Sequence, residues 1–165
     1  MKKLITLFLC FGLFLFTALP AHGQDVLVAG DSADLAKFSQ EDCLDYRRLQ
    51  LYQFLKEEDS LLVNFSDDFI DAADIWGIDW RLVPAIAGLE SSFAKRMVPG
   101  TYNAYGWAGG YFGFRSWDDS INHVSRKLSE NYYSRGLNTP ERIGPVYAPP
   151  NPNWGNLIAS IMKKI

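Results

Sequence analysis

The stretch LVPAIAGLESSFAK, residues 82–95, decides the fold of this chain. Its first eight residues are apolar or small around nearly the whole circumference of a helix, which is typical of a helix buried on most sides. We expect this helix to run from Trp80 to about Ser91, with Asp79 as its N-cap. The fold class that follows is mainly α, with a buried central helix.

Glu90 lies at the end of this helix and is the candidate for chemistry. It follows Ile86 by four residues and Val83 by seven, so its side chain should point where apolar side chains point. A helix C-terminus and apolar surroundings both disfavour a negative charge, and this keeps a carboxyl group protonated for use as a general acid. The sequence therefore predicts a buried carboxylic acid. The alternative is an ordinary helix former that frays into solvent.

The segment after Glu90, residues 91–117, contains no Asp or Glu but is rich in aromatic residues and glycine. The glycines indicate turns or short hairpin strands. Aromatic rings next to flexible glycines are a typical platform for sugar rings, whose apolar faces stack on them. We expect half of these aromatic side chains to line a groove and the others to fill the core. They are Phe93, Tyr102, Tyr105, Trp107, Tyr111, Phe112, Phe114 and Trp117.

Further helices are expected on both sides of this segment. Apolar spacing predicts a surface helix around Leu49–Leu55, a helix from Ser60 to Trp76 and a helix that begins after a Ser116 cap. Thr139 and Pro140 open a short helical turn. In the tail WGNLIASIMKKI, the residues expected to pack on the core are Leu157, Ile158, Ile161 and Met162.

The first 23 residues have the pattern of a secretory signal: two lysines, a long apolar run, and small residues that predict cleavage after Gly23. The alternative is an uncut membrane anchor. We expect residues 24–59 to form a polar leader and a surface helix, and residues 60–165 to form the domain that carries Glu90. We expect an exported protein, located in the periplasm, at the cell wall or outside the cell, with no stable membrane span after cleavage.

Composition excludes several classes of protein. Without the signal, Cys43 is the only cysteine and His123 the only histidine, so a disulfide, a metal centre or a Ser-His-Asp triad is not expected. We therefore expect neither a metal nor another cofactor. The formal net charge is −3, whereas a protein that binds nucleic acid usually has an excess of basic residues, so we expect no nucleic-acid partner.

The order DWRLVPAIAGLESSF, YNAYGW and VYAPP resembles the lysozyme-like superfamily of bacterial cell-wall glycosidases, in particular glucosaminidase-type domains and the related lytic transglycosylases. The resemblance covers about residues 65–162 and implies an α+β lysozyme-like fold with a hairpin or loop that forms the floor of a cleft. It implies that Glu90 is the catalytic acid, that Ser91 sets its position, and that Tyr147 assists, with Tyr132 or Tyr133 as alternatives. The substrate-binding residues would be Ser91, Asn103, Tyr105, Gly106, Trp107 and Tyr111.

The sequence also departs from these families. Ala94 replaces a common glycine, and the Gly-Leu-Met-Gln element of transglycosylases is absent, so the branch stays open. Most glycosidases use two carboxylates, but here Asp118 and Asp119 are committed to a helix start. We therefore expect a monomer with one essential acid, Glu90, that cleaves a β-1,4 bond in peptidoglycan or another N-acetylhexosamine glycan. The products come from hydrolysis or carry 1,6-anhydro ends. The alternatives are a non-catalytic wall-binding protein and a structural envelope protein.

Overall fold

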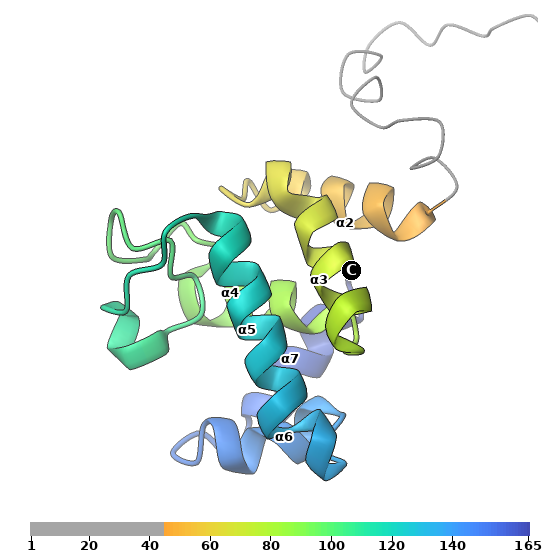
Figure 1. Ribbon diagram of the computed structural model, residues 1–165, viewed down its shortest axis with the longest axis vertical. Helices are drawn as coiled ribbons and strands as arrows, with labels where there is room; N and C mark the ends of the chain where they lie inside the picture. Colours follow the sequence, from red (N-terminus) through yellow and green to blue (C-terminus); the bar gives the residue numbers. More distant parts are fainter. Residues whose placement is uncertain (1–44) are drawn as a thin grey trace, which may run out of the picture. The chain divides into compact units, whose positions relative to one another are not determined.

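A computed structural model of this chain describes residues 45–165 (Figure 1). The predicted signal, the leader up to residue 44 and Cys43 lie outside the described residues. Residues 45–165 form a mainly helical domain with six α-helices and no strand, so the mainly α class is confirmed. The helices are α2 (Tyr46–Glu57), α3 (Ser66–Trp76), α4 (Leu82–Ser91), α5 (Trp117–Asn131), α6 (Pro140–Tyr147) and α7 (Trp154–Met162), with 3-10 turns η2 (Val63–Phe65), η3 (Trp107–Gly110) and η4 (Tyr133–Arg135).

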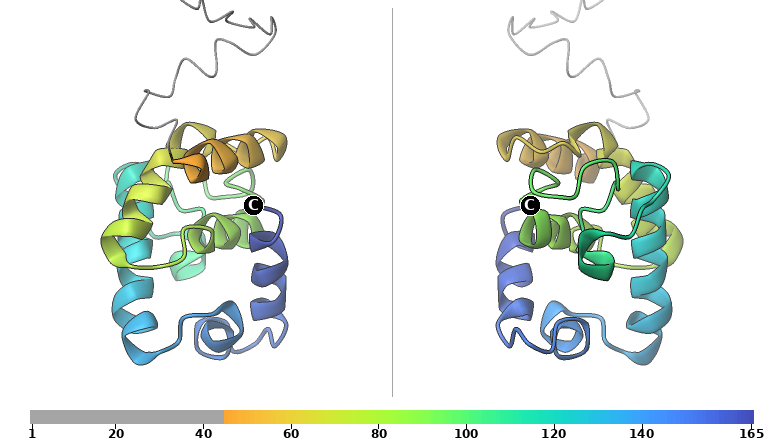
Figure 2. Two further views of the ribbon diagram at one scale, coloured as in Figure 1. Left: turned by 90° about the vertical axis from the view of Figure 1, so that its right-hand side faces the viewer. Right: turned by 90° about the vertical axis from the view of Figure 1, so that its left-hand side faces the viewer.

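Helix α4 is the central element of this domain. Figure 2 shows α4 between α5 on one side and α7 on the other, and α4 packs against both. All six residues from Leu82 to Ala87 are buried, as the apolar sequence predicts. The helix begins later than expected, because Asp79 accepts the backbone N–H of Arg81 and so closes the preceding turn instead of capping α4.

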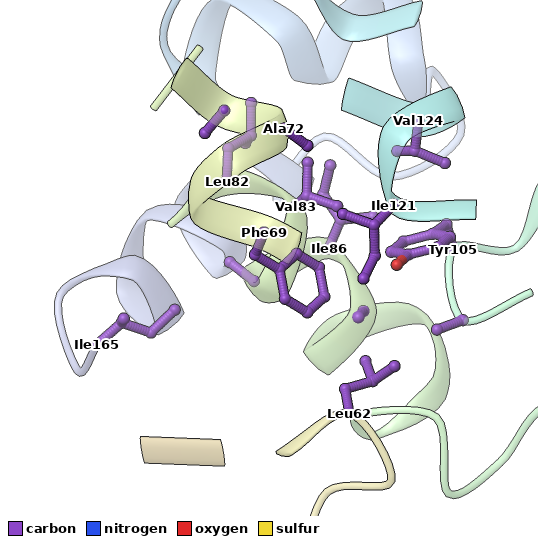
Figure 3. Close-up of a cluster of buried hydrophobic side chains, with 14 of the residues drawn as sticks. Leu62, Phe69, Ala72, Leu82, Val83, Ile86, Tyr105, Ile121, Val124 and Ile165 are labelled. Carbon is purple, nitrogen blue, oxygen red and sulfur yellow. The ribbon is translucent and has the colours of Figure 1, made fainter. Parts of the chain in front are cut away.

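The core surrounds α4 and draws side chains from every α-helix of residues 45–165, and Figure 3 shows the part of it around Ile86. Ile86 of α4 lies among Phe69 of α3, Ile121 of α5 and the ring of Tyr105 from the long α4–α5 loop. Leu51 and Leu55 bring α2 into the same core, since both are fully buried. Helix α2 therefore belongs to the packed domain.

Local capping signals place several helix ends where the sequence predicts them. The Ser116 hydroxyl accepts the backbone N–H of Asp119 at the start of α5, and Pro140 is the first residue of α6. The predicted helix 60–76 is divided into η2 and α3, because the N–H of Leu62 turns back to the Ser60 hydroxyl. In α7, Leu157 is exposed, so its predicted place in the core was wrong. None of the helices within residues 45–165 is long and apolar enough to cross a membrane.

Candidate active site

Glu90 occupies the last turn of α4, and its side chain is exposed. The prediction of a buried carboxyl group was wrong. Every residue of α4 from Leu82 to Ala87 is buried, whereas Gly88 and Leu89 are half-buried and, in the last turn, only Ser91 is buried again. The helix period fixes the direction of a side chain but not how far along the helix the surrounding elements extend. Glu90 therefore lies beyond the cover of the core, at the edge of an open pocket.

The Glu90 carboxylate is held from one side by a tryptophan of α7. The buried indole of Trp154 donates its Nε1–H to Glu90 Oε1 over 3.1 Å. The other oxygen, Oε2, lies next to Gly106, where an added Cβ would come within 3.2 Å of it. Gly106 has a φ of +75°, a left-handed conformation that glycine adopts without strain. The two oxygens thus have different surroundings: Oε1 is an acceptor for Trp154, and Oε2 lies over the glycine.

Ser91 ties the end of α4 to the loop that carries Gly106. Its hydroxyl is buried, shares its one O–H between the carbonyl oxygens of Ala87 (3.0 Å) and Ala104 (2.9 Å), and accepts the N–H of Ala94 (2.9 Å). The single donor of this hydroxyl is therefore used within the protein. The side chain is placed to position Glu90 and not to touch a ligand.

Asn103 organises the loop itself. Its Nδ2 donates to the carbonyl oxygens of Trp107 (2.9 Å) and Phe112 (3.1 Å), and its Oδ1 accepts the N–H groups of Tyr105 (3.3 Å) and Trp107 (3.2 Å). At 2% exposure the amide is inaccessible to a ligand. It fixes the turn that brings Gly106 beside Glu90.

The pocket beside Glu90 has a volume of about 360 Å³ and is lined mainly by aromatic side chains. Its lining residues are Glu90, Tyr105, Gly106, Trp107, Tyr132, Tyr147 and Ala148. They come from four parts of the fold: α4, the α4–α5 loop, the end of α5 and the end of α6. The structure thus brings Glu90 together with Tyr105, Gly106, Trp107 and Tyr147, all named from sequence.

Tyr147 supplies a neutral hydroxyl to this pocket. Its ring stacks on Trp154 with centroids 4.7 Å apart, and its hydroxyl donates to the carbonyl oxygen of Tyr105 over 3.3 Å. Burial raises the pKa of the Tyr147 phenol, and the charge of Glu90 raises it further. Tyr147 therefore stays protonated at neutral pH and acts as a hydrogen-bond donor.

Other predicted residues lie elsewhere. Tyr111 is 78% exposed and is not part of the pocket lining. The hydroxyl of Tyr133 accepts the N–H of Asp79, whereas Tyr132, the other alternative to Tyr147, lines the pocket. Of the eight aromatic residues in segment 91–117, only Tyr105 and Trp107 line this pocket. That is fewer than the half that we expected to line a groove. Phe93 and Phe114 instead fill the core.

Glu90 is the only carboxylate among the residues that line this pocket in the described part of the chain. Asp118 and Asp119 lie in the first turn of α5 and line a different hollow, together with Asp68 and Asp71 of α3. Asp119 pairs with Arg115 over 2.7 Å, which lowers the pKa of that carboxyl to about 2. Within residues 45–165 no cluster of His, Cys, Asp and Glu is suited to a metal ion.

Trp154 is the residue of this site that the sequence reasoning missed. It lies 64 positions from Glu90 in the sequence, at the start of the amphipathic helix α7. The pattern VYAPPNPNW, with an aromatic residue on either side of a proline-rich turn, holds the available signal, because such a turn returns Trp154 to the ring of Tyr147.

Comparison of the chain with models of known protein families gave no match, and comparison with curated proteins gave none either. A function for this protein therefore has to be inferred from the chemistry of the pocket and from the order of its motifs.

Proposed function

We propose that this protein is an exported glycosidase with a lysozyme-like fold that cleaves a β-1,4 bond in peptidoglycan, with Glu90 as its general acid. The observation that supports this most is the pocket in which one carboxylate, at the end of a buried helix, faces aromatic and glycine residues suited to a sugar ring. The motif order that resembles the lysozyme-like superfamily supports the same activity, because its catalytic glutamate corresponds to Glu90.

The two oxygens of Glu90 have different roles when this side chain acts as a general acid. In the protonated form, Oε1 is the carbonyl oxygen and keeps its hydrogen bond from Trp154, while Oε2 carries the proton on the side of Gly106. Donation of this proton to the glycosidic oxygen lets the leaving sugar depart as an alcohol. The remaining sugar develops oxocarbenium character, and among residues 45–165 no second carboxylate lines the pocket to meet it.

The electron-poor carbon is met by a group that the substrate or water provides. Attack by the substrate's N-acetyl group, or by a water molecule that Tyr147 or Tyr132 holds, leads to hydrolysis. Attack by the sugar's own C6 hydroxyl gives a 1,6-anhydro end. In each case the ionised Glu90 accepts a proton in the second half of the reaction, which restores the acid.

Mass spectrometry of the fragments released from purified sacculi tests this proposal. A glycosidase releases fragments whose new ends identify the bond, and 1,6-anhydro ends are lighter by one water than reducing ends. Protein that sediments with sacculi at several pH values but releases no fragments would refute the enzyme and support a wall-binding role. Absence of binding to both sacculi and chitooligosaccharides would support a structural envelope protein.

Replacement of Gly106 by alanine should impair activity more than stability alone explains. The left-handed φ costs an alanine about 1–2 kcal/mol, and its Cβ would also lie 3.2 Å from Glu90 Oε2. We expect Gly106→Ala to lower the turnover of the folded enzyme about tenfold or more, since misplaced catalytic groups are costly.

Gly77 offers the matched control for this substitution. It also has a positive φ, +63°, at the end of α3, but an added Cβ would meet no atom within 4 Å. Gly77→Ala should show a similar loss of unfolding free energy in urea and wild-type turnover. Equal turnover in the two variants would mean that the contact with Oε2 is unimportant.

A further inference from the structure

The chain directly after Glu90 and Ser91 is held in a costly backbone conformation. Ser92, Phe93 and Ala94 have φ values of 51°, 57° and 68°, so three successive residues with side chains lie in the left-handed region. Residues other than glycine adopt this region only where surrounding contacts enforce it, and such strain is often found at functional sites. Contacts with other parts of the chain must therefore hold this turn.

Some of these contacts join the turn to the end of α4. The N–H groups of Ser92 and Phe93 donate to the carbonyl oxygens of Gly88 (3.1 Å) and Ala87 (3.0 Å), which closes the end of α4. The ring of Phe93 covers Gly88 so closely that a Cβ there would lie 2.6 Å from it. These bonds fix the amide and the ring of Phe93 relative to α4, but they leave its carbonyl oxygen to another partner.

The other partner is Ser60, which precedes η2 and follows α2. Its buried hydroxyl donates to the carbonyl oxygen of Phe93 over 3.2 Å and accepts the N–H of Leu62 over 3.0 Å. The same region makes two more contacts with the turn. Phe54 of α2 meets the Phe93 ring edge-on at 5.5 Å, and the Lys95 ammonium group donates to the carbonyl oxygen of Glu58.

We propose that Ser60 is a positioning residue for Glu90: its hydroxyl holds the left-handed turn 92–94 and thereby sets the carboxylate against Trp154 and Gly106. For catalysis, this role rests on the function proposed above. Ser60 lies on a segment outside the motifs that resemble glycosidases, 33 residues from Phe93. Without its hydrogen bond, the turn relaxes towards ordinary backbone angles and the last turn of α4, with Glu90, moves with it.

The indole N–H of Trp154 reports the position of Glu90 without any need for activity. The chain has five tryptophans, so the full chain labelled with ¹⁵N-tryptophan gives five indole signals, and the signal lost in Trp154→Phe is that of Trp154. We expect Ser60→Ala to move this signal in the folded protein. Ser125→Ala is the control, since the Ser125 hydroxyl is buried without a hydrogen-bond partner among residues 45–165.

Kinetics provide the second measurement. Ser60→Ala should lower kcat about ten- to a hundredfold with KM within about twofold, because a displaced acid impairs the transition state and not sugar binding. An unmoved Trp154 signal in folded Ser60→Ala, or a kcat equal to that of Ser125→Ala, would overturn the role of Ser60 and leave the proposed function intact. A moved signal in Ser60→Ala, together with no release of fragments by the wild-type protein, would support the positioning contact and refute the glycosidase.

A second variant tests the same proposal if Ser60→Ala does not fold. Phe54→Leu keeps an apolar side chain but removes the edge-on contact with Phe93. It should move the Trp154 signal in the same direction, by a smaller amount. No movement in this variant would count against control of Glu90 through the turn.

Discussion

Glu90→Gln should abolish the release of glycan fragments from sacculi while leaving the fold intact. Glutamine has the shape of glutamate, and its amide oxygen still accepts the indole N–H that Trp154 gives to Oε1. The amide cannot donate a proton to a departing alcohol at any pH. Loss of general acid catalysis costs about 10²–10⁴-fold in rate, so we expect turnover to fall by at least this factor.

The fold of Glu90→Gln can be checked separately from its activity. Glu90 is exposed, and surface substitutions change stability by about 0.5 kcal/mol or less, so the midpoint of thermal unfolding should stay within about 4 °C. Binding of chitooligosaccharides should persist, because the aromatic lining of the pocket is unchanged.

Glu57 offers a matched control for the removal of a carboxylate. It is exposed and is the last residue of α2, as Glu90 is exposed near the end of α4, but it does not line the pocket. Glu57→Gln should release fragments at the wild-type rate. Full activity of Glu90→Gln would remove Glu90 from the mechanism, and equal losses in both variants would point to a general effect of charge.

Features encoded within a few residues were predictable from the sequence. The apolar circumference of residues 82–91 predicts the central helix, and Ser116 and Pro140 predict where α5 and α6 begin. Each signal depends on a helix and its own cap, so no knowledge of the rest of the fold is needed. The closeness of Glu90 to Gly106, by contrast, was expected only from the resemblance of their motifs to the lysozyme-like superfamily.

Features that depend on distant partners were not predictable in this way. The exposure of Glu90 depends on where the elements around α4 stop, and its hydrogen bond from Trp154 joins residues 64 positions apart. The helix predicted from Ser60 to Trp76 is another example, because Ser60 at its predicted start is bound to Phe93, 33 positions away, and the α-helix begins only at Ser66. Periodicity treats a helix as if its surroundings were uniform, and tertiary contacts then overrule it.

The assignment of Ser91 and Asn103 changes with the structure for a related reason. Both are polar residues in motifs that suggest sugar contacts, but both are buried and bonded to backbone groups. A sequence shows that a polar residue is present, not whether its partner is a ligand or the protein's own backbone. Buried polar groups that are fully bonded give a loop one conformation.

Asn103→Ala should therefore be among the most destabilising substitutions at this site. The change removes four hydrogen bonds at once and leaves two carbonyl oxygens and two N–H groups of the loop without their partner. A buried polar group left unsatisfied costs about 1–3 kcal/mol, and some of these groups can turn to water as the loop relaxes. We expect the free energy of unfolding in urea to fall by about 2–4 kcal/mol.

Asn138 provides the control, because it is exposed in the loop between η4 and α6. Asn138→Ala should change the free energy of unfolding by about 0.5 kcal/mol or less. Asn103→Asp separates the roles of the amide: its Oδ1 still accepts the N–H groups of Tyr105 and Trp107, but a carboxylate oxygen faces the two carbonyl oxygens that Nδ2 served. That repulsion should make Asn103→Asp at least as unstable as Asn103→Ala. The instability of Asn103→Asp should decrease as the pH falls, because protonation of the carboxyl group removes the repulsion.

Turnover of the folded fraction then decides what the loop does for catalysis. The Asn103 side chain accepts the N–H of Trp107 and donates to the carbonyl oxygen of the same residue. Gly106 directly precedes Trp107, so a loop that relaxes without these bonds moves Gly106 away from Glu90 Oε2. Turnover measured well below the unfolding transition should fall in Asn103→Ala along with stability, as in Gly106→Ala. Wild-type turnover in a folded but destabilised Asn103→Ala would show that Glu90 needs only Trp154 and the end of α4 to be placed for catalysis.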